Sequence, residues 1–164
     1  MANLCLAALE YLRASVLAPD GINPAISAIA ARDNVELGAL QELQVLLQNI
    51  PSDLADENEA VVYPNISIYS KALDNVLLEK FAKYSGPMTL VMEVRVSAER
   101  HLLLERELAR YVEAATEVLG ARRGQWTPNL AYNGGYKVEF KEVRLGGKNF
   151  IQSARIEVGL IAHQ

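Results

Sequence analysis

The sequence changes its hydrophobic period near residue 98, and this change limits the possible folds more than any other feature. From Pro87 to Ser97 apolar residues alternate with mixed ones, which is typical of a strand with one fully apolar face. From Glu99 to Gly120 the apolar residues instead recur at the spacing of a helix with one buried stripe, at Leu104, Leu108, Val112, Ala115 and Leu119. We therefore expect a strand that leads directly into a long helix.

Both ends of this helix can also be predicted. Ser97 is a suitable N-cap because its hydroxyl can accept a hydrogen bond from a free backbone N–H group. Glu99 would lie favourably at the positive end of the helix dipole. Gly120 can adopt the left-handed conformation that closes many helices. The pattern thus places the helix between Ser97 and Gly120.

Residues 1–50 are predicted to form a helical N-terminal part. Ala2–Leu17 has apolar residues at helical spacing, and the turn-forming sequence APDG at 18–21 ends it. A second, short helix is expected from Asn23 and Pro24 to Ala31, because proline is favoured in the first turn. The composition of Val35–Gln48 is also compatible with a helix, although Gly38 weakens this prediction.

An acidic segment and the first predicted strand follow. Residues 50–60 contain four carboxylates but lack the ligand spacing and glycine of an EF-hand, so we expect a solvated loop. Val61–Tyr69 is the first predicted strand, with Tyr63 and Tyr69 on the face opposite its apolar residues. Pro64 cannot donate a ladder hydrogen bond, which places this strand at a sheet edge or breaks it. A charged connector would then lead to the central strand.

The C-terminal part is predicted to be a long connection and a hairpin. Ala121–Gly135 is rich in glycine and contains proline, so we interpret it as a loop. The next strand begins at Tyr136, and its apolar phase slips by one residue at Glu142, which indicates a β-bulge. Gly146-Gly147 would form the turn into a return strand over 150–160.

Together these elements predict one α+β domain over residues 1–164. Residues 61–162 would form its core, in the order strand, strand, helix and hairpin. We expect a mainly antiparallel four-stranded sheet with the long helix packed on one face and additional N-terminal helices, because this buries both apolar faces. The long helix would then pack against Val94, Val96, Phe150 and Ile156.

Composition and charge exclude several classes of protein. The net charge of −4 argues against a dedicated nucleic-acid binder, since phosphate binding depends on clustered Lys and Arg. The single cysteine, Cys5, cannot form an internal disulfide and fits a reducing compartment. Asn3, Glu10 and Arg13 interrupt the apolar N-terminus, which disfavours a signal peptide or a membrane span. We expect a protein made in the cytoplasm.

Catalytic, cofactor and metal sites are not predicted. His101 and His163 have no nearby set of residues that suggests a triad, and His101 beside Glu105 is interpreted as a surface pair. The sequence contains no Walker loop or dinucleotide fingerprint. The charged residues between Glu105 and Glu113 are interpreted as the mixed-sign solvent face of the long helix, or as a face toward another subunit. We therefore expect no enzyme, no cofactor and no bound metal.

The predicted loop at 121–135 contains the candidate recognition residues. Trp126 is the only tryptophan, and Arg122 and Arg123 lie beside it. Trp and Arg are over-represented among residues that dominate interface energy, so we expect Trp126 to anchor a partner. The alternative is that Trp126 packs over the end of the long helix, whose negative end the arginines complement. Tyr63 and Tyr69, on the mixed face of an edge strand, are further candidates.

From Pro51 onward, over about two-thirds of the chain, the sequence resembles tail terminator proteins of long-tailed phages, also described as head-tail joining or minor tail completion proteins. The residues that carry the resemblance are PSDLADENEAVVYPNISIY, EKFAKYSGPMTLVMEVRVSAER, ELARYVEAATEVLGARRGQW and GGYKVEFKEVRLGGKNFIQSARIEVGL. They follow the order strand, strand, helix, hairpin that such proteins show. Residues 1–50 carry little of this resemblance.

The resemblance implies a virion structural protein, made in the host cytoplasm and located at the head-tail junction. It would form a homohexameric ring that caps the tail tube and provides the surface for head joining. Its partners would be copies of itself, the tail-tube protein and a head-side connector or stopper protein, with DNA only passing through and no membrane. Two alternatives stay open, namely a head-side connector or stopper ring and a small-ligand-binding α+β domain.

Overall fold

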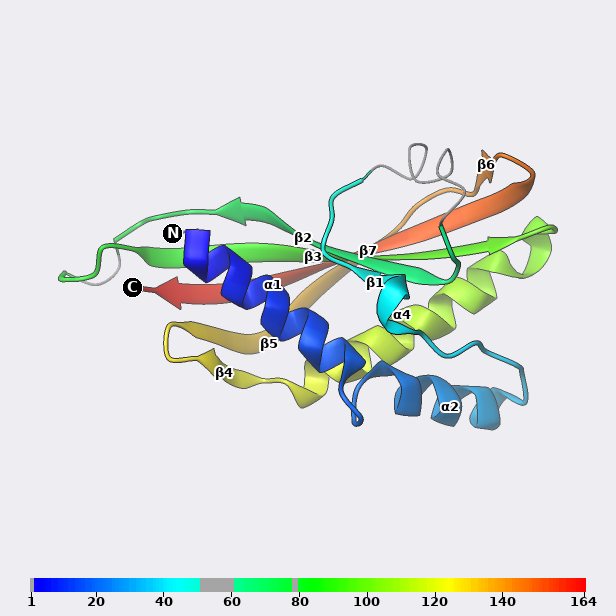
Figure 1. The fold of residues 1–164 in the computed structure, drawn as a ribbon, viewed down its shortest axis with the longest axis horizontal. Helices are drawn as coiled ribbons and strands as arrows, with labels where there is room; N and C mark the ends of the chain where they lie inside the picture. Colours follow the sequence, from blue (N-terminus) through cyan, green and yellow to red (C-terminus); the bar gives the residue numbers. More distant parts are fainter. Residues whose placement is uncertain (1, 51–60, 78–79) are drawn as a thin grey trace.

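A computed structural model describes residues 2–50, 61–77 and 80–164 of the chain. These residues form a mixed α+β fold in which three α-helices pack against a curled sheet (Figure 1). The α-helices are α1 (Ala2–Leu17), α2 (Ile22–Asp33) and α4 (Leu104–Ala121), and the short 3-10 helices are η1 (Glu42–Gln44) and η2 (His101–Leu103). The strands are β1 (Val45–Leu46), β2 (Asn65–Leu73), β3 (Ser85–Ala98), β4 (Gly124–Thr127), β5 (Leu130–Phe140), β6 (Arg144–Gly146) and β7 (Asn149–His163).

The sheet has the strand order β1-β2-β3-β7-β5-β4, and β6 continues the pairing with β7 beyond the end of β5. β1 is parallel to β2, and all other pairs are antiparallel. The predicted α+β class is confirmed, but the predicted four-stranded sheet is wrong. The additional strands β1, β4 and β6 have two, four and three residues. Segments this short cannot show a recognisable alternation in the sequence.

The core lies between α4 and the inner face of β3 and β7, as predicted. Every predicted contact residue of α4 is buried, and so are its partners Val94, Val96 and Ile156, while Phe150 is half-buried and packs against the same cluster. The apolar stripe of α1 joins this core through Leu4, Ala8, Leu12 and Val16. The N-terminal helices α1 and α2 were also predicted, and Asn34 ends α2 in a left-handed conformation, with φ of 53°.

The ends of α4 differ from the prediction. β3 continues to Ala98 because its ladder with β7 holds Ser97 opposite Ile151, so Ser97 is part of a strand and not a helix cap. η2 then leads into α4, and no side-chain hydrogen bond from the described residues caps its start. At the other end, Gly120 lies inside the helix, and Arg122 is the C-cap with φ of −105°.

The predicted helix over Val35–Gln48 is wrong, since this segment has no α-helix and, apart from η1 and β1, no regular secondary structure. Side chains of the helices bind its backbone. The Asn23 amide accepts a hydrogen bond from the Leu40 N–H group and donates one to the Leu40 carbonyl, each 2.8 Å long. The Tyr111 hydroxyl donates a 2.9 Å hydrogen bond to the carbonyl of Gly38. These contacts satisfy backbone groups that a helix would otherwise pair within itself.

The first predicted strand begins later than expected, because β2 starts at Asn65, directly after Pro64. Of the two predicted outcomes, the structure shows the one in which the strand is broken at Pro64, and β1 is the edge strand in the order of the sheet. β1 pairs with Ile66 and Ser67 only, and among the described residues no strand covers the outer side of Ile68–Leu73. The predicted acidic loop lies almost entirely at 51–60, outside the described residues, so it stays a prediction.

The predicted loop at Ala121–Gly135 is also wrong, because β4 and the first half of β5 form a hairpin there. Thr127 pairs with Leu130, so the turn consists of Pro128 and Asn129 only. The pairing of β5 with β7 shifts register between Tyr132 and Tyr136, where Asn133-Gly134-Gly135 forms a bulge. The glycines therefore belong to an irregular strand, whose composition is typical of a loop.

The bulge predicted near Glu142 is confirmed. Phe140 pairs with Ala154, and Arg144 pairs with Ile151. The chain therefore advances four residues on the β5–β6 side and only three on β7, which leaves one extra residue in the bulge. The turn that follows is displaced by one residue from the prediction. Gly146 pairs with Asn149, which leaves Gly147 and Lys148 in the turn, and Gly147 supplies the positive φ of 65°.

Two ion pairs tie α4 to α2, so part of its charged surface faces another helix and not only solvent. Arg110 Nε lies 2.8 Å from Asp33 Oδ2, and Arg32 binds Glu113 through two hydrogen bonds of 2.5 and 2.9 Å. Hydrogen bonds from Arg32 and then Arg110 lower the pKa of Asp33 to about 2, and Arg32 also lowers the pKa of Glu113. Both carboxylates therefore stay ionised well below neutral pH.

Leu108→Ala tests the central packing of α4. The substitution should lower the free energy of unfolding by about 2–5 kcal/mol, because it leaves a cavity between the helix and the sheet. Chemical denaturation measures this change. Leu102→Ala, at an exposed position just before α4, is the control and should change stability by less than about 0.5 kcal/mol. An equally small loss at Leu108 would contradict the packing.

Candidate assembly surfaces

The candidate functional features of the chain are surfaces. In residues 2–50, 61–77 and 80–164, no three His, Cys, Asp or Glu side chains come together as metal ligands would. The described helices include none long and apolar enough to cross a membrane. Three surfaces contain unusual arrangements, namely the sheet face opposite the helices, called here the outer face, and the two ends of the molecule.

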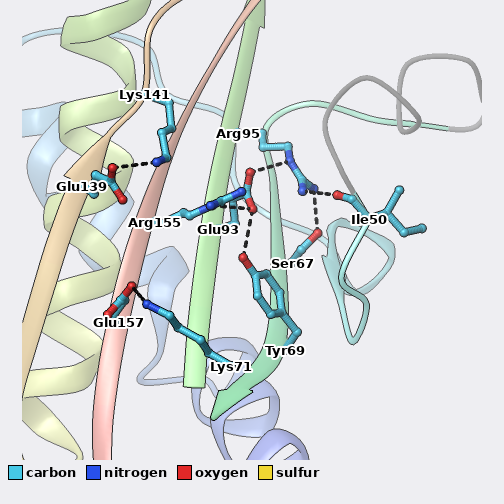
Figure 2. Close-up of polar contacts among 10 residues, drawn as sticks. All are labelled: Ile50, Ser67, Tyr69, Lys71, Glu93, Arg95, Glu139, Lys141, Arg155 and Glu157. Carbon is cyan, nitrogen blue, oxygen red and sulfur yellow. Dashed lines mark hydrogen bonds and ion pairs between the residues drawn. The ribbon is translucent and has the colours of Figure 1, made fainter. Parts of the chain in front are cut away.

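A polar network covers the middle of the outer face (Figure 2). Strand register explains it, because Ser67, Glu93, Arg155 and Glu139 lie in one row across β2, β3, β7 and β5. Glu93 is the centre of the network. Its carboxylate lies 3.4 Å from Nε of Arg95 and 3.4 Å from Nε of Arg155, and it accepts a 3.3 Å hydrogen bond from the Tyr69 hydroxyl.

The centre of this network is buried, although it consists of charged groups. Glu93 is 3% exposed and Arg95 is 1% exposed. The guanidinium of Arg95 donates hydrogen bonds of 2.7 Å to the Ser67 hydroxyl and to the backbone carbonyl of Ile50. Arg95 therefore holds the chain after β1 against the sheet. Burial, followed by the nearby carboxylate of Glu93, raises the pKa of Tyr69, so its hydroxyl remains a donor at neutral pH.

The sequence indicated a mixed face on β3 but not that this face is buried. The alternation of Glu93 and Arg95 with Met92, Val94 and Val96 was visible. What covers the charged pair comes from distant segments, as the contact of Arg95 with Ile50 shows. The available signal was two opposite charges at positions two apart on one strand, which places both on the same face.

Ion pairs at the margin of the network are more exposed. Lys141 Nζ lies 2.7 Å from Glu139, and Lys71 binds Glu157 across β3. Pairs of this kind contribute little to stability, because water and salt screen them. The outer face thus changes from a buried network at β3 to an accessible, charged surface along β5.

Trp126 is the candidate anchor, and the structure places its side chain inside the fold. It is 6% exposed, stacks on Tyr11 with a centroid separation of 4.8 Å, and contacts Tyr132 at 5.5 Å. Its indole N–H donates a 2.8 Å hydrogen bond to the carbonyl of Arg122 at the end of α4. This geometry favours the alternative in which Trp126 packs over the helix end.

The other four candidate residues do not form one site with Trp126. Arg122 binds Asp20 in the turn after α1, at 2.6 Å, which lowers the pKa of that carboxyl. Arg123 is exposed beside it. Tyr63 is half-buried just before β2, and Tyr69 belongs to the network on the outer face. The tyrosines and the arginines were already predicted to lie on different elements.

The connection between β2 and β3 lies at one end of the long axis, and the start of α4 and β6 lie at the other (Figure 1), and both segments contain exposed large apolar side chains. At one end, the connection between β2 and β3 exposes what we call the hairpin patch; at the other, the start of α4 and β6 expose the α4-start patch. Phe81 of the hairpin patch is 95% exposed, and Leu102 of the α4-start patch is 77% exposed. The hairpin patch consists of Val76, Leu77 and Phe81, and the α4-start patch of Leu102, Leu103 and Leu145.

Sequence reasoning missed both patches. Leu102 falls within the segment predicted as helix, but it belongs to η2 and is exposed, and the hairpin patch lay inside a connector interpreted as charged. The triplet Leu102–Leu104 was a possible signal, since three successive residues cannot all face one side of a helix. Apolar groups exposed in this way commonly mark contacts with other proteins.

No protein-family model matches the chain, and no curated protein matches it. The resemblance to tail terminators therefore rests on the pattern of residues described above.

Arg95→Met tests whether the buried network supports the fold. It should lower the free energy of unfolding by about 3–5 kcal/mol, because it removes one partner of a buried ion pair. Denaturant titration measures the loss. In Glu93→Leu/Arg95→Met, where both charges are replaced, the loss should be smaller than in the single variant. Lys71→Met, at an exposed ion pair, is the control and should cost less than about 1 kcal/mol.

Trp126→Ala separates the two roles considered for this residue. Burial against Tyr11 and Tyr132 predicts a loss of about 3 kcal/mol or more in the free energy of unfolding. Arg123→Ala, three residues away and exposed, should change stability by less than about 0.5 kcal/mol. If Trp126→Ala instead loses assembly while its free energy of unfolding is nearly unchanged, Trp126 contacts a partner and is not a core residue.

Proposed function

We propose that this protein is a virion structural protein of the tail-terminator type. It forms a ring that caps the tail tube of a long-tailed phage and provides the surface to which the head is joined. Two kinds of support exist. One is the resemblance of residues 51–160 to that family, which is an associational argument. The other is physical, namely two different apolar patches at opposite ends of one subunit.

The two patches favour a ring because of where they lie. A ring needs a heterologous contact, in which one surface of a subunit meets a different surface of the next. The hairpin patch and the α4-start patch consist of different residues and lie at opposite ends of the long axis. A contact between them leaves one free patch on each side, so it repeats, and it gives a closed ring when the rotation between neighbouring subunits brings the last copy back to the first. Burying both patches supplies the driving force.

The charge distribution fits a protein through which DNA only passes. On the outer face, basic side chains are paired with carboxylates, such as Lys141 with Glu139 and Arg155 with Glu93. The net charge of the chain is −4. Tight binding to DNA requires many unpaired Lys and Arg side chains, which would hold the strand and not release it. The proposed partners are other copies, the tail-tube protein and the head-side connector or stopper protein.

A head-side connector or stopper would use the same kind of ring, so the partner protein separates these two functions. A small-ligand-binding domain would need an enclosed apolar pocket with a few convergent polar groups. The hollow on the outer face near the bulge of β5 has a volume of about 400 Å³ and is open to solvent. It is lined by residues that include Tyr136, Lys137 and Glu157, and it supports the ligand-binding function less well than the patches support assembly.

Electron microscopy of the purified protein, alone and mixed with isolated tail tubes, tests the proposal. We expect rings, either free or only on the tube ends. Phe81→Ser, or Leu102→Ser combined with Leu103→Ser, should abolish rings and leave the fold intact, because these side chains are exposed. Leu43→Ser, at a 70% exposed leucine outside both patches, is the matched control.

Three outcomes would contradict the proposal. One is wild-type protein that stays monomeric and does not bind tail tubes. Another is ring formation that both patch variants preserve, which would place the contact elsewhere. The third is binding to head-side connectors without binding to tail tubes, which would favour the connector or stopper function.

A further inference from the structure

The second half of β5 is an open edge of the sheet. β4 pairs with β5 only up to Tyr132, and β7 pairs with its other side through Phe140. Among the described residues, no strand lies on the outer side of Asn133–Phe140. An open edge of this kind presents unpaired backbone donors and acceptors to other chains.

The orientation of the backbone shows which groups face outward. The N–H group of Lys141 donates a 2.9 Å hydrogen bond to the carbonyl of Ser153 on β7. In an antiparallel ladder successive residues point their N–H and C=O groups to opposite sides. Glu139 and Lys137 therefore also pair toward β7, which leaves the backbone groups of three alternate residues at the free edge, Tyr136, Val138 and Phe140.

We propose that this edge binds the same edge of a second copy, antiparallel, about a two-fold axis that passes through Val138. In this arrangement Val138 faces Val138 of the second copy, and Tyr136 faces Phe140 of the second copy. These are the residues whose backbone groups point outward, so each pair exchanges two hydrogen bonds. The two sheets join into one continuous sheet across the axis.

Side chains of the edge are complementary to themselves in this register. On the outer face, Lys137 lies opposite Glu139 of the second copy, and the two-fold axis repeats this pair. On the inner face, Tyr136 lies opposite Phe140 of the second copy, and these rings are 48% and 49% exposed in the single chain. Cross-strand pairs of opposite charge and of aromatic rings are the contacts that stabilise antiparallel strands.

Neighbouring registers are disfavoured by the same charges. Shifting the axis toward Lys137 places Lys137 opposite Lys137 of the second copy. Shifting it the other way, toward Glu139, places Glu139 opposite Glu139 and Lys137 opposite Lys141 of the second copy. Like charges directly opposite each other destabilise a ladder. The charges of β5 thus favour the register centred on Val138 over its two neighbours.

The simplest competing explanation is that Lys137 only protects the edge, since edge lysines often prevent strands from pairing. An edge lysine prevents pairing between two copies of the same strand when it lies opposite another positive charge. Glu139, two residues further on the same face, removes that repulsion in the proposed register. The contact of Glu139 with Lys141 within the chain is exposed and therefore weak, so it competes little.

This pairing is independent of the proposed ring. It uses the edge of β5, whereas the ring contact uses the hairpin patch and the α4-start patch at the two ends. A two-fold contact is also closed at two copies, while a heterologous contact continues beyond two copies. The mass of the free protein therefore distinguishes the two contacts.

Charge-swapped variants test the pairing by analytical ultracentrifugation over a range of concentrations. Wild-type protein should show a monomer–dimer equilibrium. Lys137→Glu places Glu opposite Glu139 twice and should weaken the dimer by about tenfold or more. The double variant Lys137→Glu/Glu139→Lys restores both opposite-charge pairs between the copies and should dimerise more tightly than Lys137→Glu, although within each chain it sets like charges against Glu157 and Arg155 of β7. Circular dichroism of each variant shows whether it folds.

Amide hydrogen exchange gives an independent reading. Dimerisation should slow exchange at Tyr136, Val138 and Phe140 in wild type and in the double variant, but not in Lys137→Glu. Three results would overturn the proposal: a wild-type monomer at every concentration reached, a dimer that Lys137→Glu leaves unchanged, or a double variant that stays monomeric. Loss of rings in the patch variants, with this dimer retained, would leave the inference standing.

Discussion

The ladder between β3 and β7 is the interaction on which the rest of the structure depends. All 14 residues of β3 pair with β7 without a break, from Ser85 opposite His163 to Ala98 opposite Phe150. Its inner side forms the floor on which α4 packs. Its outer side brings Glu93 next to Arg155. The ladder also sets the length of the molecule, and so the separation of the two apolar patches.

Charged residues on the ladder make its register specific. A slip of one residue between β3 and its neighbours would move Glu93 and Arg95 toward the apolar core, because side chains alternate between faces. Burying unpaired charges there costs several kcal/mol per ion. In the observed register both side chains have partners, and Arg95 also binds the carbonyl of Ile50. The buried network thus links the position of the chain after β1 to the alignment of the central strands.

The sequence predicted the parts of the fold whose periodicity is long and local. β3, α4 and β7 each span more than 13 residues, so their patterns were clear, and α1 and α2 were found as well. The short strands and the irregular segment after α2 depend on partners distant in the chain, such as Asn23 for Leu40. The candidate site was predicted less well. Trp126 was expected to anchor a partner, and its burial depends on Tyr11 from a different helix, which no local pattern contains.

The open sheet explains why the single subunit retains several surfaces suited to assembly. Closing the sheet would satisfy both edges, but β1 covers only two residues of β2, and β4 covers only the first residues of β5. An open edge carries a risk of indiscriminate pairing, which charges on the edge reduce. On β5 the alternation of Lys137 with Glu139 favours a match with its own copy in the register centred on Val138 over the two neighbouring registers, in which like charges would meet. Selectivity of this kind needs no enclosed pocket, because it follows from the order of side chains along one exposed strand.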